Sequence, residues 1–236
     1  MSDAEGANGG EEGGEDDFDE QRSSGGQTQS GDFDPEAVAA EAGVELPDVP
    51  EWDDEYLNRV SDRLMFNYDL ERDRRVRGER FEMVGTMRVE NRKQFLHPAL
   101  NYANHESREY IFARRTPRVT VAELERLVEL GHELADDAEW LVPDEEHYGT
   151  DFTFVAVVSE TSDDVREFVE SFSDRTLLKF GYYGHYEVNL VVAVPETHEV
   201  VASQNADVAQ AFALWDDVQP SDDRGLLGRI VDRLRG

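Results

Sequence analysis

The sequence predicts an α+β domain with a mixed, mostly antiparallel sheet and flanking helices over residues 51–215. Three observations carry this prediction. Apolar and polar residues alternate between residues 81 and 89, as they do in a half-buried strand. Residues 151–159 are apolar on both faces, as in a central strand, and residues 185–194 alternate between a face that is apolar throughout and a face that starts polar and becomes apolar. Apolar residues recur at helical spacing between residues 120 and 140.

A first helix is expected at residues 52–67, where four large apolar residues recur at helical spacing: Trp52, Tyr56, Val60 and Leu64. The alternating strand 81–89 is then followed by a polar turn at residues 90–93 and a return strand that begins at residues 94–96. A third strand is expected at residues 109–115.

The second half of the domain is expected to alternate strands and helices. Thr120 and Glu123 have the spacing of a capping box, which predicts a helix from there to about Trp140. A second cap at residues 161–164 follows the strand 151–159 and predicts another helix. The remaining expected elements are a hairpin at 176–194, a short strand near Val200 and a helix at 206–214.

Residues 1–50 are expected to form a disordered acidic tail and linker, because such a composition buries too little apolar surface to offset the entropy lost on ordering. One short helix is expected within this region, at residues 35–42. Asp34 provides its N-cap, Pro35 its first residue and Gly43 its end.

Residues 216–236 are expected to form a linker and a C-terminal amphipathic helix. Apolar residues between Arg224 and Arg235 alternate at helical spacing with arginines. A basic amphipathic helix can bind anionic lipid or a groove on a partner. Residues 224–235 could therefore contact a membrane surface or a scaffold partner, or dock on their own domain.

The charge of the chain is strongly acidic, with a formal net charge of −31 at pH 7. Only Lys93 and Lys179 are lysines, and all other basic residues are arginines. Such a composition predicts a halophilic cytoplasmic protein, because molar salt screens the self-repulsion of its acids. The chain has no cysteine, which excludes disulfides and thiolate metal sites. It shows neither a signal-peptide pattern nor an apolar run long enough for a membrane span.

Three runs carry a resemblance to a known family, and they lie at residues 95–106, 147–154 and 177–187. They resemble a family of uncharacterised haloarchaeal proteins, a domain of unknown function, over about residues 50–215. The resemblance brings no activity with it and therefore implies no functional residue.

Four polar residues near two of the expected strands are candidates for chemistry. His147 and Asp151 are four residues apart just before one strand, and His185 and Glu187 share one face of another. Two imidazoles and two carboxylates could hold a divalent metal or serve as an acid and a base. The alternative is structural, with Glu187 paired to a cation and the histidines hydrogen-bonded to backbone.

The hairpin at residues 176–194 adds Lys179, Tyr183 and Asn189 as ligand-binding candidates. A three-residue loop at residues 182–184 places Lys179 opposite Glu187, because cross-strand partners share a face. We therefore expect these two side chains to form an ion pair.

A polar loop at residues 95–106 supplies further ligand-binding candidates: His97, Asn101, Tyr102 and His105. Many hydrogen-bonding side chains in one connection indicate a binding loop. The equal alternative is a loop whose asparagines satisfy its own backbone.

Residues 72–118 contain 12 basic and six acidic residues, which is a local excess of positive charge. Arg114 and Arg115 are the ligand-binding candidates of this segment, since arginine forks bind phosphates and carboxylates. The favoured interpretation is that its arginines pair with acids of neighbouring elements. The order of elements resembles a metal-dependent nuclease core, but the third strand, 109–115, lacks the Glu-x-Lys pattern of that core. Nucleic acid is therefore not a favoured partner.

These observations favour a non-catalytic domain that binds a small anion or a protein partner, with no cofactor expected. One alternative is a metal-dependent hydrolase or nuclease that uses His147, Asp151, His185 and Glu187 with a divalent metal. Another is a peripheral membrane or scaffold protein that acts through the C-terminal helix.

Overall fold

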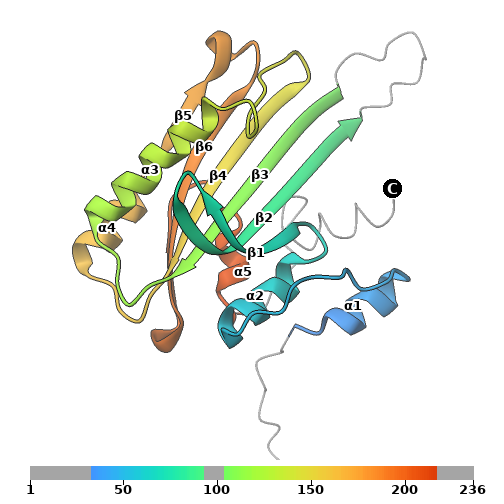
Figure 1. Cartoon of the computed structure of the whole chain (residues 1–236), viewed down its shortest axis with the longest axis vertical. Helices are drawn as coiled ribbons and strands as arrows, with labels where there is room; N and C mark the ends of the chain where they lie inside the picture. The colour runs from blue at the N-terminus through green and yellow to red at the C-terminus, as the bar shows by residue number, and fades with distance from the viewer. Residues whose placement is uncertain (1–32, 93–103, 217–236) are drawn as a thin grey trace, which may run out of the picture.

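Seven strands form one mixed sheet with helices on both faces in the computed structural model, which describes residues 33–92 and 104–216 (Figure 1). The elements in chain order are α1 (Pro35–Ala42), α2 (Glu55–Leu64), β1 (Asp69–Val76), β2 (Glu79–Arg92), β3 (Asn104–Arg115), α3 (Val121–Ala135), β4 (His147–Val157), α4 (Asp163–Ser171), β5 (Asp174–Leu177), the 3-10 turn η2 (Leu178–Gly181), β6 (His185–Val194), the 3-10 turn η3 (Pro195–Thr197), β7 (Glu199–Ala202) and α5 (Ala209–Phe212).

The strand order is β1-β2-β3-β4-β6-β5, and β7 also pairs with β6. β4 is parallel to both of its neighbours, β3 and β6, and the helices α3 and α4 make the two crossovers. The other four pairings are antiparallel. This arrangement confirms the predicted α+β class and its mixed, mostly antiparallel sheet.

Each face of the sheet has its own apolar core, because side chains alternate along every strand. On one face Phe112, Phe154 and Leu190 form a core cluster with apolar residues of α3 and α4. On the other face Val155 and Val191 pack against α2 and α5. The central strands β4 and β6 are therefore covered on both faces over most of their length.

The second core ends before the strands do. Towards the first residues of β4 and β6, the face that carries Val155 and Val191 becomes polar, with Asp151 and Thr153 on β4 and Glu187 on β6. The polar residues share the face of Val155 and Val191 because each is an even number of residues away from the apolar residue on its own strand. The polar end of this face holds the candidate site.

Several predicted boundaries are corrected by the structure. The sequence does not predict β1, because only two of its eight residues, Leu70 and Val76, are buried and apolar. The turn expected at residues 90–93 is wrong for its first three residues, which continue β2 and pair with β3. The capped helix expected from Thr120 to Trp140 ends earlier, at Ala135, although its capping box is present.

The short helix expected at residues 35–42 is present, with Asp34 accepting hydrogen bonds as its N-cap and Gly43 in the left-handed conformation at its end. The predicted acidic tail up to residue 32 and the C-terminal helix at 224–235 lie outside the described residues. Within the described part of the chain, no helix is long and apolar enough to cross a bilayer.

Candidate functional site

Four charged side chains lie in one row across neighbouring strands. In the pairing register Glu109 of β3 is opposite Asp151 of β4, and Asp151 is opposite Glu187 of β6. Arg175 of β5 is opposite Glu187 from the other side. Residues opposite one another in a sheet share a face, so this register gathers three carboxylates and one guanidinium.

Three residues of this region converge closely enough to hold a metal ion. One ligand atom from each of Asp151, His185 and Glu187 lies within 4.8 Å of the other two. His185 lies two residues before Glu187 on the same face of β6, opposite Gly149. The side chains of His185 and Glu187 are only 12% and 9% exposed, so the cluster is largely shielded from water.

Glu187 is held by a partner on each carboxylate oxygen. Arg175 Nε lies 3.1 Å from Oε1, and Asn205 Nδ2 donates a hydrogen bond of 2.8 Å to Oε2. His185 Nε2 is 3.4 Å from the same Oε1. The carboxylate is therefore oriented by residues from β5 and from the segment after β7.

The imidazole of His185 is biased towards its neutral form. Burial lowers its pKa below the ordinary value of 6.5, and the positive charge of Arg175 lowers it further, while Glu187 acts in the opposite direction. The ring lies against Gly149, where an added Cβ would stand 3.1 Å from His185 Cε1. The glycine therefore provides the space in which this ring sits.

His147 is not part of this cluster, and its ring links two other segments of the fold by hydrogen bonds. Its ring Nδ1 is 2.7 Å from the carbonyl oxygen of Tyr183, and its Nε2 is 2.8 Å from the Thr150 hydroxyl. A carbonyl only accepts, so Nδ1–H donates to Tyr183 and the Thr150 hydroxyl donates to Nε2. Both ring nitrogens are thus engaged, and the structure brings together three of the four candidates that the sequence suggested.

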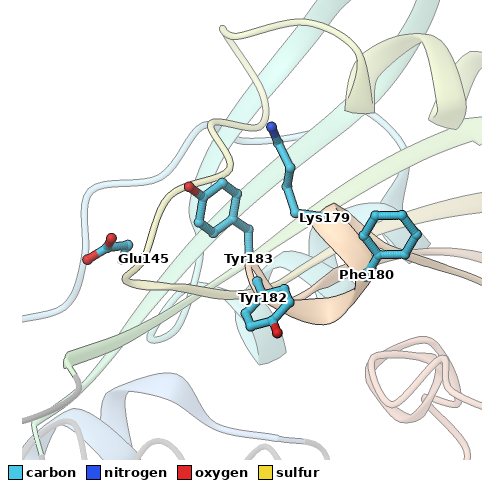
Figure 2. A pocket seen from close by; sticks show the side chains of 5 residues that line it. All are labelled: Glu145, Lys179, Phe180, Tyr182 and Tyr183. Carbon is cyan, nitrogen blue, oxygen red and sulfur yellow. The ribbon is translucent and has the colours of Figure 1, made fainter.

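Lys179 does not pair with Glu187, so that prediction is wrong. β5 ends at Leu177, which is opposite His185, and the connection spans residues 178–184. Lys179 and Phe180 adopt positive φ angles of 48° and 59° within this connection, whereas a loop confined to residues 182–184 would have left both in an extended strand. Figure 2 shows Lys179 beside Tyr183, pointing away from Phe180, and its Nζ is 5.9 Å from the Tyr183 ring centroid.

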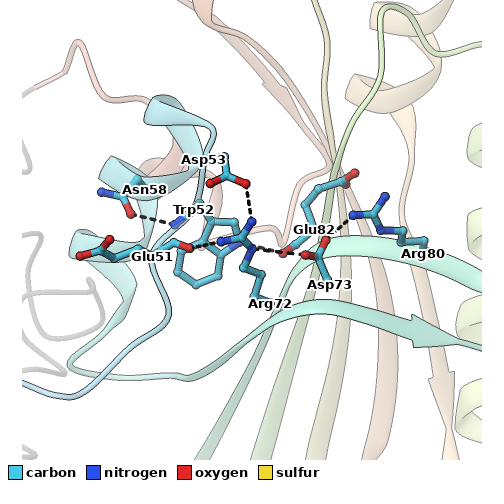
Figure 3. Close-up of polar contacts among 8 residues, drawn as sticks. All are labelled: Glu51, Trp52, Asp53, Asn58, Arg72, Asp73, Arg80 and Glu82. Carbon is cyan, nitrogen blue, oxygen red and sulfur yellow. Dashed lines mark hydrogen bonds and ion pairs between the residues drawn. The ribbon is translucent and has the colours of Figure 1, made fainter.

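The arginine-rich segment is paired within the fold. Arg72 contacts Asp53 and Asp73, and Asp73 also binds Arg80 (Figure 3). The ligand-binding candidates behave alike: Arg114 pairs with Glu79, and Arg115 pairs with Asp54. These contacts support the interpretation that the local positive charge is neutralised by neighbouring acids.

Two of the other ligand-binding candidates, Asn189 and His105, lie within the described residues. Asn189 is buried and accepts a hydrogen bond from the Ser203 hydroxyl. His105 is in β3, at a position opposite Asn91 in the register. His97, Asn101 and Tyr102 lie outside the described residues.

Sequence reasoning missed Glu109, Arg175 and Asn205. Glu109 had only a weak signal, because it directly precedes the apolar residues 110–113 of a strand that also contains charged residues. Arg175 and Asn205 had none, since their contacts with Glu187 depend on the length of one connection and on the path of the chain after β7.

A protein-family model with the description "Domain of unknown function (DUF8052)" matches residues 53–214. The matched residues run from just before α2 to just after α5, so they cover the whole sheet and both crossover helices. No curated protein and no solved structure matches the chain.

Proposed function

The chain belongs to the DUF8052 family, a domain of unknown function, and we propose that it binds a divalent transition-metal ion through Asp151, His185 and Glu187. The observation that carries this proposal is the convergence of one ligand atom from each residue to within 4.8 Å. Backbone pairing between β4 and β6 positions all three, so the site is built on rigid elements.

The donor set favours a borderline metal ion. Carboxylate oxygens suit Mg²⁺, Ca²⁺ and Mn²⁺, whereas an imidazole nitrogen suits Zn²⁺, Fe²⁺ and Ni²⁺. One imidazole with two carboxylates is therefore best matched by Mn²⁺, Fe²⁺ or Zn²⁺. Glu109 adds a third carboxylate in the same row, opposite Asp151.

Electrostatics support a cation in preference to the small anion that the sequence suggested. In this row three carboxylates outnumber the single guanidinium of Arg175. The arginines that could have bound an anion elsewhere, Arg114 and Arg115, are paired with acids.

Binding without catalysis is the form of the proposal that the geometry supports best. Arg175 and Asn205 contact both oxygens of Glu187, which leaves this carboxylate poorly placed to accept a proton from water as a general base. A hydrolase would also need a substrate beside the ion. Turnover of phosphate or carboxylic esters by the metal-loaded protein is the result that would favour the hydrolase alternative.

Isothermal titration calorimetry of the metal-free full chain with Mn²⁺ and Zn²⁺ tests the proposal. We expect one bound ion per chain and a loss of at least about tenfold in affinity for Asp151→Asn and for Glu187→Gln. Glu170→Gln removes an equal charge from the exposed surface of α4 and is the matched control. Equal affinities in all four proteins would contradict the proposal.

A second candidate function is binding of a protein partner through the tip of the β5–β6 connection. Phe180 is 97% exposed and Tyr182 is 85% exposed, and the backbone at Phe180 is in the left-handed region. Exposed aromatics and a strained backbone both occur at interaction sites. The double variant Phe180→Ser and Tyr182→Ser should fold normally. A protein that the wild type retains from an extract should not be retained by this variant. The variant should also fail to bind the same partner once that partner has been purified.

The amino-acid composition supports a salt-adapted, cytoplasmic setting for this function. Acids greatly outnumber bases over the whole chain, and nearly all bases are arginines. We expect the melting temperature to rise between 0.1 and 2 M KCl, roughly the range over which the Debye length falls from about 10 Å to below about 3 Å. A melting temperature that falls or stays constant over this range would contradict the setting.

A further inference from the structure

The guanidinium of Arg175 lies against two of the three proposed metal ligands. Its terminal Nη2 is 2.9 Å from His185 Nε2 and 3.2 Å from His185 Nδ1. Its Nε is 3.1 Å from Glu187 Oε1. An organic cation thus contacts the same nitrogen and carboxylate atoms that a metal ion would use.

Arg175 and a metal ion cannot both use these ligand atoms. A metal ion binds a carboxylate oxygen or an imidazole nitrogen at about 2.0–2.2 Å. A guanidinium about 3 Å from the same two atoms would then be in close contact with the ion. Two positive charges at that separation repel strongly in a site that is largely shielded from water. The arginine must leave before the ion can enter.

The position of Arg175 allows it to leave. Its side chain is 51% exposed, whereas that of Glu187 is 9% exposed. β5 has four residues and pairs with β6 alone among the strands of the described chain, so it forms one edge of the sheet. The head of the side chain can therefore turn into solvent without moving a central strand.

We propose that Arg175 is an internal counter-cation that occupies the site in the metal-free protein and is exchanged for the divalent ion on binding. This inference rests on the proposed function, because it describes how the same site is regulated. In the metal-free protein Arg175 then holds the Glu187 carboxylate in place. The exchange also favours divalent ions over monovalent ones, since a single positive charge gains little by replacing another.

Three variants of Arg175 test the exchange by calorimetry with Mn²⁺ and Zn²⁺ at constant salt. We expect Arg175→Gln, which removes the competing charge, to bind about tenfold more tightly than the wild type. Arg175→Lys retains the charge and should stay close to the wild type, and Arg175→Ala should follow Arg175→Gln. Circular dichroism establishes that each variant is folded.

Arg166→Gln is the matched control, because it removes the same charge from α4, where Arg166 pairs with Glu199. Its metal affinity should stay within about twofold of the wild type, so that a general change in net charge is separated from a local one. A second readout is the Arg175 Nε–H resonance, which should move towards the value of a free arginine when diamagnetic Zn²⁺ is added.

The outcomes separate the two proposals. If the wild type and Arg175→Gln bind the ion equally, and the Nε–H resonance does not move, the exchange is wrong while the metal site stands. If neither the wild type nor any Arg175 variant binds an ion, the proposed function itself is wrong and the exchange falls with it.

Discussion

The guanidinium of Arg175 meets the carboxylate of Glu187 across the β5–β6 pair, with Arg175 Nε 3.1 Å from Glu187 Oε1. Asn205 holds the other oxygen, so Glu187 ties together β5, β6 and the segment after β7. Both partners fix the carboxylate when no ion is bound, and Asn205 still holds Oε2 once Arg175 has left. The site is therefore preorganised, and its organisation contributes to the stability of the fold as well as to binding.

Glu187→Gln should lower the unfolding free energy of the metal-free protein by about 1 kcal/mol, because one charged contact is lost while Arg175 can still reach water. In the wild type, Zn²⁺ or Mn²⁺ should raise the melting temperature, since an ion that binds only the folded state stabilises it. In the variant the same ions should have almost no effect. Urea denaturation and thermal melts measure both quantities, and an equal metal-induced shift in the two proteins would contradict the assignment of Glu187 as a ligand.

The elements that sequence patterns predicted well are those whose signal is local. The capping box of Thr120 and Glu123 and the N-cap Asp34 were found because each involves residues within one turn. β4 was found because its apolar run is buried on both faces. β1 was missed because it is an edge strand in which only Leu70 and Val76 are buried, and charged edge strands lack the alternation of a half-buried one.

The candidate site was predictable only in part, for the same reason. Alternation placed His185 and Glu187 on one face of a strand, and the structure has them so. That Asp151 lies beside them depends on the register between β4 and β6, which sequence does not specify. The expected cation opposite Glu187 is present, but it is Arg175. The sequence predicts a three-residue connection between β5 and β6. The connection in the structure, residues 178–184, is four residues longer, but it is also odd in number.

Gly131→Ala should destabilise the fold, although alanine is the better helix former by about 1 kcal/mol. An added Cβ at Gly131 would stand 2.8 Å from Val188 Cγ2 and 3.2 Å from Phe154 Cε2, because α3 packs closely on the sheet there. Overpacking of this kind costs about 1–3 kcal/mol, so we expect a net loss of about 1 kcal/mol in urea denaturation. Glu125→Ala on the exposed side of α3 is the control and should cause no loss. A Gly131→Ala variant as stable as this control would show that α3 can move away from the sheet.

The pairing of α4 with β7 should depend on pH through Glu199. Arg166 donates to both of its carboxylate oxygens, at 2.6 and 3.0 Å, and this hydrogen bonding holds the pKa of Glu199 below its ordinary value of 4.5. A carboxyl whose pKa is lowered by folding stabilises the protein above its ordinary pKa, and this stabilisation is lost as the pH falls through the lower folded value. The difference in unfolding free energy between the wild type and Glu199→Gln should thus be constant above about pH 5 and shrink below 4.5. Urea denaturation at pH 7, 4 and 3 measures it, and a difference that is unchanged at pH 3 would contradict the role of this pair.

His147→Ala should separate stability from metal binding. His147 is buried, and its ring forms hydrogen bonds with the carbonyl of Tyr183 and the hydroxyl of Thr150. These bonds connect the β5–β6 connection to the start of β4. Its removal leaves a buried hydroxyl and a carbonyl without their partner, which should lower the unfolding free energy by about 2 kcal/mol. The affinity for Mn²⁺ or Zn²⁺ should nevertheless stay within about twofold of the wild type, because both ring nitrogens are already engaged and neither faces an ion. His147→Asn, which keeps a donor and an acceptor, should recover part of the stability. If the folded His147→Ala variant instead loses metal binding to the same extent as Glu187→Gln, then His147 is a ligand. The four residues suggested by the sequence would then describe the site better than the three that converge in the structure.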